Sequence, residues 1–204
     1  MVRVKVCGIT NIEDALFCSQ SGVDALGFIF YKQSPRYITP QKAKNIIENL
    51  GPFVSRVGVF VNEDKKKVYE VAGYLNLDIL QFHGKESPAY CRYFLKRFKV
   101  IKVFFPYQFP DKKYIKVNAY LFDIKLEDKK KGVTLDDSFL ERIKSIRDKK
   151  TILSGGLTPG NVSELIKKVK PYAVDVARGV EISPGKKDKN MVKEFINKAK
   201  QVRY

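Results

Sequence analysis

Eight short apolar segments recur along the chain, and their spacing restricts the folds that this sequence can adopt. Each segment is rich in β-branched and aromatic residues, which is typical of buried strands, and successive segments begin 19 to 32 residues apart. The segments cover residues 2–7, 25–31, 56–61, 79–83, 100–105, 119–124, 151–155 and 173–177. They predict eight strands whose connections are long enough to hold helices.

Most of the connecting stretches carry helical signals. Apolar residues at helical spacing, such as Val68, Val71 and Leu75, lie between the third and fourth segments. Four of the expected helices begin with residues that favour a helix N-terminus: Asn11, Pro40, Pro88 and Asn161. Residues 106–118 contain two prolines and predict a weak helix at best. The repeated unit is therefore a strand followed by a helix.

Eight such units in 204 residues average about 25 residues each, near the lower limit of roughly 200 residues for a closed (β/α)8 TIM barrel. A doubly wound open sheet is the alternative. The regular repeats, the absence of a GxGxxG motif after the first strand and a helix expected over 190–202 favour the barrel. We expect one barrel domain spanning residues 1–204, without a linker.

The charge balance raises the question of a polynucleotide partner, because the formal net charge is +17. Much of the excess is lysine inside helical stretches, such as Lys65, Lys66 and Lys67, where a solvated helix face is the simpler interpretation. The chain has no apolar run of 18 residues and no signal-peptide pattern at its start. We therefore expect a soluble, cytoplasmic protein that binds neither nucleic acid nor membranes.

In a barrel of this kind chemistry takes place at the carboxyl ends of the strands. Alternation along the first strand directs Lys5 and Cys7 inward, so Cys7 faces the barrel mouth above a cation that favours its thiolate form. The same parity directs Asp123 into the mouth. Asp175 points inward one layer deeper, where it can pair with Lys5, because the first and last strands are neighbours in a closed barrel.

Two glycine-containing loops stand where barrel enzymes commonly bind phosphate, after the seventh and eighth strands. Gly155 and Gly156 lie in the first loop and Gly179 lies in the second. Glycine lets backbone amides approach an anion closely. By contrast, the chain has a single histidine, His83, and only three cysteines with no CxxC spacing, so a metal site or disulfide framework is poorly supported.

Six motifs together resemble the phosphoribosylanthranilate isomerase family of tryptophan biosynthesis. They are VKVCGIT (4–10), GFIFYKQSPRYI (27–38), RVGVFVN (56–62), LQFHGKE (80–86), ILSGGLTPGNV (152–162) and AVDVARGVEISPGKKD (173–188). The resemblance implies a (β/α)8 barrel and an Amadori rearrangement of a small phosphorylated substrate. It implies no metal or organic cofactor, and a homodimer is compatible with it.

The family's functional residues can be carried over where the motifs match. The resemblance implies Cys7 as the general base, Asp123 as the general acid and Arg36 as the ligand of the substrate carboxylate. It places the phosphate on the loops at Gly155, Gly156 and Gly179; His83 and Asp175 complete the expected substrate-binding set.

The expected acid and base must both work away from their ordinary protonation states. Unperturbed pKa values of about 8.5 for cysteine and about 3.9 for aspartate leave each residue type mostly in the wrong form at neutral pH. We expect Lys5 to shift the pKa of the Cys7 thiol. For Asp123, we expect a dry pocket bounded by Phe28 or Phe105 to shift the pKa of the carboxyl group.

The chain departs from the family pattern at two places. Family members usually carry a glycine-rich segment and a tryptophan after the sixth strand, whereas this chain has LEDKKKGVTLDDSF there, with Gly132 alone and no tryptophan anywhere. Ala177 and Arg178 stand where serines are common. Strand parity predicts that the Arg178 side chain points away from the phosphate.

Three other functions remain as alternatives. A ribulose-phosphate epimerase would share the phosphate loops but use metal ligands that one histidine does not supply. An indole-glycerol-phosphate synthase would be expected to carry a lysine and glutamates at the strand ends. A basic nucleic-acid-binding module is the alternative outside the enzymes.

Overall fold

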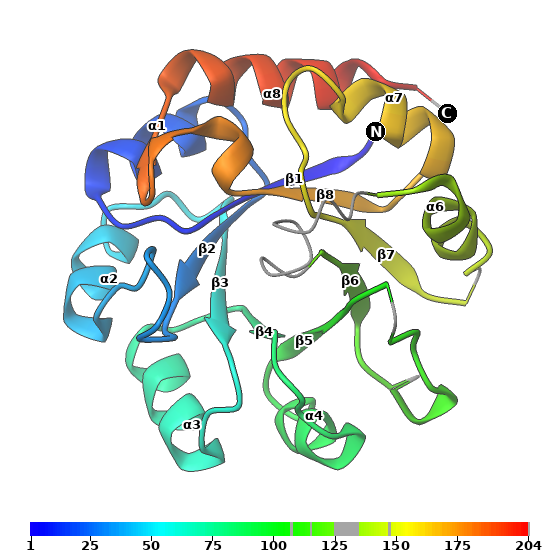
Figure 1. The fold of residues 1–204 in the computed structure, drawn as a ribbon. Helices are drawn as coiled ribbons and strands as arrows, with labels where there is room; N and C mark the ends of the chain where they lie inside the picture. Colours follow the sequence, from blue (N-terminus) through cyan, green and yellow to red (C-terminus); the bar gives the residue numbers. More distant parts are fainter. Residues whose placement is uncertain (107, 115, 125–134, 147, 204) are drawn as a thin grey trace.

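The computed structural model describes residues 1–106, 108–114, 116–124, 135–146 and 148–203, and these contain a closed barrel of eight parallel strands (Figure 1). The strands follow chain order around the ring, and β1 pairs with β8 to close it. They are β1 (Arg3–Cys7), β2 (Ala25–Ile29), β3 (Ser55–Phe60), β4 (Ile79–Phe82), β5 (Lys99–Phe104), β6 (Ala119–Phe122), β7 (Lys150–Leu153) and β8 (Ala173–Val176). The predicted barrel is confirmed, and each predicted strand end lies within two residues of the observed one.

Helices surround the barrel on its outside (Figure 1). The α-helices among the described residues are α1 (Ile12–Gln20), α2 (Pro40–Ile47), α3 (Lys65–Tyr74), α4 (Pro88–Phe94), α6 (Asp137–Lys144), α7 (Val162–Val169) and α8 (Lys189–Gln201). Among the described residues between β5 and β6, the helical structure is a short 3-10 turn, Lys112–Tyr114, in keeping with the weak helix that the two prolines predicted. None of the described helices combines the length and apolar character needed to cross a membrane.

The predicted helix starts are confirmed by the caps. The Asn11 side chain accepts a hydrogen bond from the Asp14 amide at the start of α1. Pro40 and Pro88 are the first residues of α2 and α4, where a missing amide proton costs nothing. Asn161 stands at the N-cap of α7 but makes no capping bond with its side chain.

Strand alternation separates two apolar layers. Inside the barrel, a small cluster that includes Val103, Phe105, Leu121 and Ile152 fills the space between the strands. The larger cluster lies between strands and helices and includes Val2, Val4, Val6 and Phe28. Phe28 is therefore packed under the helices, and the expectation that it bounds the pocket of Asp123 was wrong. Phe105 faces inward as expected.

A short hairpin between β8 and α8 was not predicted. A 3-10 turn (Arg178–Val180) leads into β9 (Glu181–Ser183), which pairs antiparallel with β10 (Lys186–Lys187). The hairpin is tied to the loop after β1, because the Thr10 hydroxyl donates to the carbonyl of Gly185 over 2.5 Å. The carboxyl ends of β1 and β8 thus share one rim.

Candidate active site

A buried ion pair links the first and last strands below the barrel mouth. Lys5 Nζ lies 2.8 Å from Asp175 Oδ1, and the two side chains are 5% and 6% exposed. The two residues are direct partners in the β1–β8 ladder. Burial lowers the pKa of Lys5, but the neighbouring Asp175 and Cys7 outweigh it and hold that pKa above its ordinary value. The predicted pair is confirmed.

Cys7 is the last residue of β1 and lies in a space that a glycine leaves open. Its partner on β2 is Gly27, where an added Cβ would come within 2.6 Å of Cys7 Sγ. Burial raises the pKa of the Cys7 thiol, and the Lys5 ammonium only partly offsets this. We expected Lys5 to favour the thiolate; the ammonium acts in that direction, but burial has the stronger effect. At neutral pH the unliganded protein therefore holds Cys7 as a thiol.

Asp123 follows β6 and faces the single histidine of the chain. His83 Nε2 lies 3.6 Å from Asp123 Oδ2, and the His83 ring packs against Phe105 at 5.7 Å between ring centroids. Burial lowers the pKa of His83, more than the nearby Asp123 raises it, so the ring is neutral at pH 7. Gln81 Nε2 lies 3.3 Å from His83 Nδ1, so the amide of Gln81 contacts the edge of the ring that faces away from Asp123.

A second glycine makes room for Asp123. A Cβ at Gly155 would lie 3.0 Å from Asp123 Oδ1 and 2.9 Å from the Ile124 amide, which donates to that same oxygen. Asp123 therefore sits against backbone on the side of β7. Lys125, which follows Asp123 by two residues and shares its strand face by alternation, and the segment containing Gly132 lie outside the described residues.

Arg36 crosses the rim above Gly8. An added Cβ at Gly8 would lie 2.5 Å from Arg36 Cδ, so the aliphatic part of the arginine rests on the backbone next to Cys7. Its guanidinium is bound to Glu181 of β9, with Nη2 only 2.6 Å from Oε2. The sequence identified the arginine but not this partner, which lies 145 residues away.

The two glycine loops lie against one another. Gly155 and Gly156 both have positive φ, +88° and +82°, a conformation that favours glycine. Their amides have no backbone acceptor among the described residues. Gly179 packs so closely on the Leu157 carbonyl that no side chain fits between them. The loops after β7 and β8 thus present adjacent backbone, as a phosphate cradle needs.

A second buried ion pair shapes the loop that carries His83, and no sequence pattern predicted it. Lys102 Nζ lies 3.0 Å from Glu86 Oε2 and also donates to the carbonyls of Phe82 and Gly84. Glu86 in turn accepts from the amides of Asn62 and Gly84. Five residues on β3 to β5 or in the loops that follow them are thereby linked. Within the described part of the chain, no three His, Cys, Asp or Glu side chains gather as metal ligands would.

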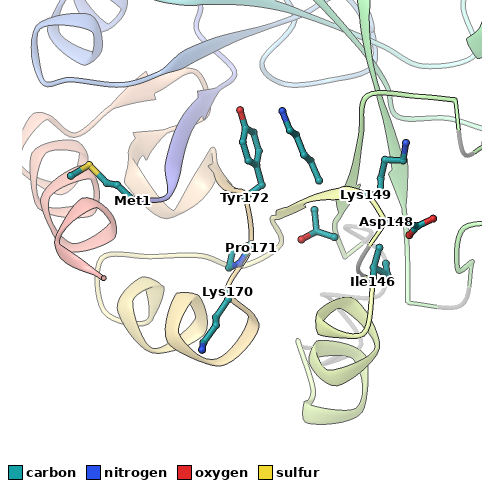
Figure 2. A pocket seen from close by; sticks show the side chains of 9 residues that line it. Met1, Ile146, Asp148, Lys149, Lys170, Pro171 and Tyr172 are labelled. Atoms are coloured by element: carbon teal, nitrogen blue, oxygen red, sulfur yellow. The ribbon is translucent and has the colours of Figure 1, made fainter. Parts of the chain in front are cut away.

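A hollow of about 540 Å³ lies at the opposite end of the barrel (Figure 2). It is lined by residues that precede β1, β7 and β8 or begin β7: Met1, Ile146, Asp148, Lys149, Lys150, Thr151, Lys170, Pro171 and Tyr172. None of the expected site residues lines it. Its position at the amino ends of the strands separates it from the chemistry of the mouth.

Comparison with known proteins shows to which family the chain belongs. Residues 4–198 match the family model described as N-(5′-phosphoribosyl)anthranilate (PRA) isomerase. The N-(5′-phosphoribosyl)anthranilate isomerase of Thermotoga neapolitana is 47% identical over 204 residues, covering 98% of this chain and 99% of the relative.

Two solved structures are similar over the same length. One shows monomers that were generated from the dimeric phosphoribosylanthranilate isomerase of Thermotoga maritima, with 42% identity and a TM-score of 0.85. The other is a phosphoribosylanthranilate isomerase in complex with reduced 1-(o-carboxyphenylamino)-1-deoxyribulose 5-phosphate, with 43% identity and a TM-score of 0.85. Each comparison covers 99% of this chain and 100% of the other.

The raised pKa of Cys7 predicts the pH dependence of its alkylation. The reactive form is the thiolate, so a pKa above the ordinary value means that the rate with iodoacetamide rises about tenfold per pH unit from pH 7 to 9, without a plateau. Peptide mass spectrometry after timed quenching measures this rate. Cys18 and Cys91 are internal controls, because burial raises the pKa of each to about 12. A plateau below pH 8 would show that Lys5 outweighs burial.

Proposed function

The chain belongs to the N-(5′-phosphoribosyl)anthranilate isomerase family, and we propose which of its residues carry out the family's reaction. The protein is an isomerase of tryptophan biosynthesis that converts N-(5-phosphoribosyl)anthranilate to 1-(2-carboxyphenylamino)-1-deoxyribulose 5-phosphate by an Amadori rearrangement. Membership of this family decides between the alternatives that the sequence left open, and it favours the isomerase over the epimerase, the synthase and the nucleic-acid-binding module.

Asp123 is the proposed general acid, and Cys7 is the proposed general base, acting through the minor thiolate form that Lys5 favours. The reaction requires one group to protonate the ribose ring oxygen, so that the ring opens, and another to remove a proton from the sugar's C2. The observation that carries this assignment is the position of the two side chains at the carboxyl ends of β1 and β6, each in a space left by a glycine. The neutral His83 next to Asp123 is suited to hold the acid in place and to contact the sugar.

The proposed substrate contacts surround this pair. Arg36 binds the anthranilate carboxylate, because a guanidinium can hold a carboxylate through two parallel hydrogen bonds. The amides of Gly156 and Gly179 bind the phosphate. Gly155 belongs to the same loop and also leaves space for the side chain of Asp123. Asp175 is bound to Lys5 through Oδ1, and its proposed substrate contact therefore uses its other oxygen.

The organisation of the whole protein is also part of the proposal. Residues 1–204 form one barrel domain, and the protein works in the cytoplasm as a homodimer, in line with the dimeric Thermotoga maritima relative. Light scattering after gel filtration tests the assembly: a mass of twice the 23.4 kDa of the chain is expected. A mass equal to one chain at micromolar concentration would contradict the dimer and leave the barrel assignment unchanged.

Replacing either proposed catalytic group should abolish most of the activity. We expect Cys7→Ala and Asp123→Asn each to lower kcat by about 10²- to 10⁴-fold, the range for a lost acid or base, with the fold intact by circular dichroism. Loss of the substrate's fluorescence measures the rate. Cys18→Ala, in the interior of α1, is the control and should cost some stability but no activity. Retention of more than about a tenth of kcat would remove that residue from the mechanism.

Arg178 provides a test of the phosphate assignment. Its side chain is exposed and has no partner among the described residues, in keeping with the predicted outward direction. Arg178→Ser should therefore change KM by less than about threefold, which corresponds to under roughly 0.7 kcal/mol. Steady-state kinetics of the two proteins measure the change. A rise of about tenfold or more would show that the guanidinium, and not backbone amides alone, holds the phosphate.

A further inference from the structure

We infer that Glu181 is a positioning residue that turns Arg36 toward the carboxylate of the substrate. Neither the motifs nor the family resemblance assigned a role to this residue, which lies in the hairpin that was not predicted. The inference rests on the proposed function, in which Arg36 binds that carboxylate. Three features of the rim support it: the edge of the guanidinium that Glu181 occupies, the rigidity of the surroundings, and the charge of Glu181 itself.

Glu181 occupies one edge of the guanidinium and leaves another open. Arg36 Nε donates to Oε1 at 2.9 Å and to Oε2 at 3.0 Å, while Nη2 donates to Oε2 at 2.6 Å. Nη1 has no hydrogen-bond partner among the described residues. A guanidinium has five N–H groups in a fixed plane. The end formed by Nη1 and the second hydrogen of Nη2 therefore remains for a ligand carboxylate, in the plane that Glu181 sets.

The surroundings hold this pair rigidly. Lys187 Nζ lies 2.8 Å from Glu181 Oε1 and donates to the Cys7 carbonyl over 2.7 Å. The Gly185 amide also donates to Glu181, over 3.3 Å. Through Glu181 and Lys187, the arginine is linked by hydrogen bonds to the backbone carbonyl of the proposed base. A rotation of the guanidinium would break its three hydrogen bonds to Glu181.

The burial and charge of Arg36, Glu181 and Lys187 suit an acidic ligand. The Glu181 side chain is 3% exposed and that of Lys187 is 1% exposed. Burial acts to raise the pKa of Glu181, but Arg36 and Lys187 outweigh it and hold that pKa below its ordinary value, so the carboxylate is ionised. Arg36, Lys187 and Glu181 together carry one net positive charge.

The role of Glu181 can be measured as a preference between two ligands. The first is reduced 1-(o-carboxyphenylamino)-1-deoxyribulose 5-phosphate, and the second is the same compound without its carboxyl group. Calorimetric titration gives the Kd of each, and their ratio reports only on recognition of the carboxylate. We expect Glu181→Gln and Arg36→Met each to reduce the preference of the parent protein at least fivefold. The double variant should reduce it no further than Arg36→Met alone, because Glu181 acts through the arginine.

A second arginine–carboxylate pair supplies the matched control. Arg56 Nε and Nη2 donate to Asp78 at 2.8 Å each, in the same side-on geometry, but at the start of β3 near the other end of the barrel. Asp78→Asn should leave the preference unchanged. If Glu181→Gln does not fold, Glu181→Asp keeps the charge but shortens the reach by one methylene, and the same fivefold loss is expected.

The outcomes separate the inference from the function on which it rests. A preference within twofold of the parent protein in Glu181→Gln and Glu181→Asp, with a reduced preference in Arg36→Met, would overturn the positioning role alone. An unchanged preference in Arg36→Met would overturn both this role and the assignment of the carboxylate to Arg36. Failure of the parent protein to bind either compound would overturn the proposed function, and the inference with it.

Discussion

The buried pair of Lys5 and Asp175 is the interaction around which the mouth of the barrel is built. It joins the strands that close the ring, directly beneath Cys7 and within the electrostatic reach of His83. Removing one partner would leave an unpaired buried charge, at a cost of about 3–5 kcal/mol. Because a domain is typically stable by only about 5–15 kcal/mol, this pair must stay intact while chemistry proceeds above it.

The site is shaped as much by missing side chains as by those that are present. Gly27, Gly155 and Gly8 each leave a space that Cys7, Asp123 or Arg36 fills. An ordinary side chain at any of the three positions would collide with a residue of the proposed mechanism or with its backbone. Close approach, more than conformational freedom, explains the glycine at position 27, whereas Gly8 and Gly155 also need their positive φ.

Local sequence patterns were enough to predict the barrel, and insufficient for the finer contacts of the site. Short apolar segments and their spacing located β1 to β8, and strand alternation predicted the pair of Lys5 with Asp175 and the inward direction of Cys7 and Asp123. Glu181 and Lys102 were missed because their partners, Arg36 and Glu86, lie in the loops that follow other strands, and no short motif records such pairs. The predicted direction of the Cys7 pKa shift was wrong, because burial raises this pKa and the extent of burial depends on the folded surroundings. The resemblance assigned roles to residues, but it too said nothing of these contacts.

The contacts across the rim have a consequence for how the protein folds. Cys7 and Lys187 are separated by 180 residues, Lys5 and Asp175 by 170, and Arg36 and Glu181 by 145. Contacts between such distant parts of a chain form only after the loop entropy between them has been lost, so they slow folding and come late in it. Because the β1–β8 pairing that closes the ring also brings Lys5 and Asp175 together, we expect the site to be completed in that same step. Catalytic competence should therefore be gained cooperatively with the whole fold, and a partly folded chain should show none of it.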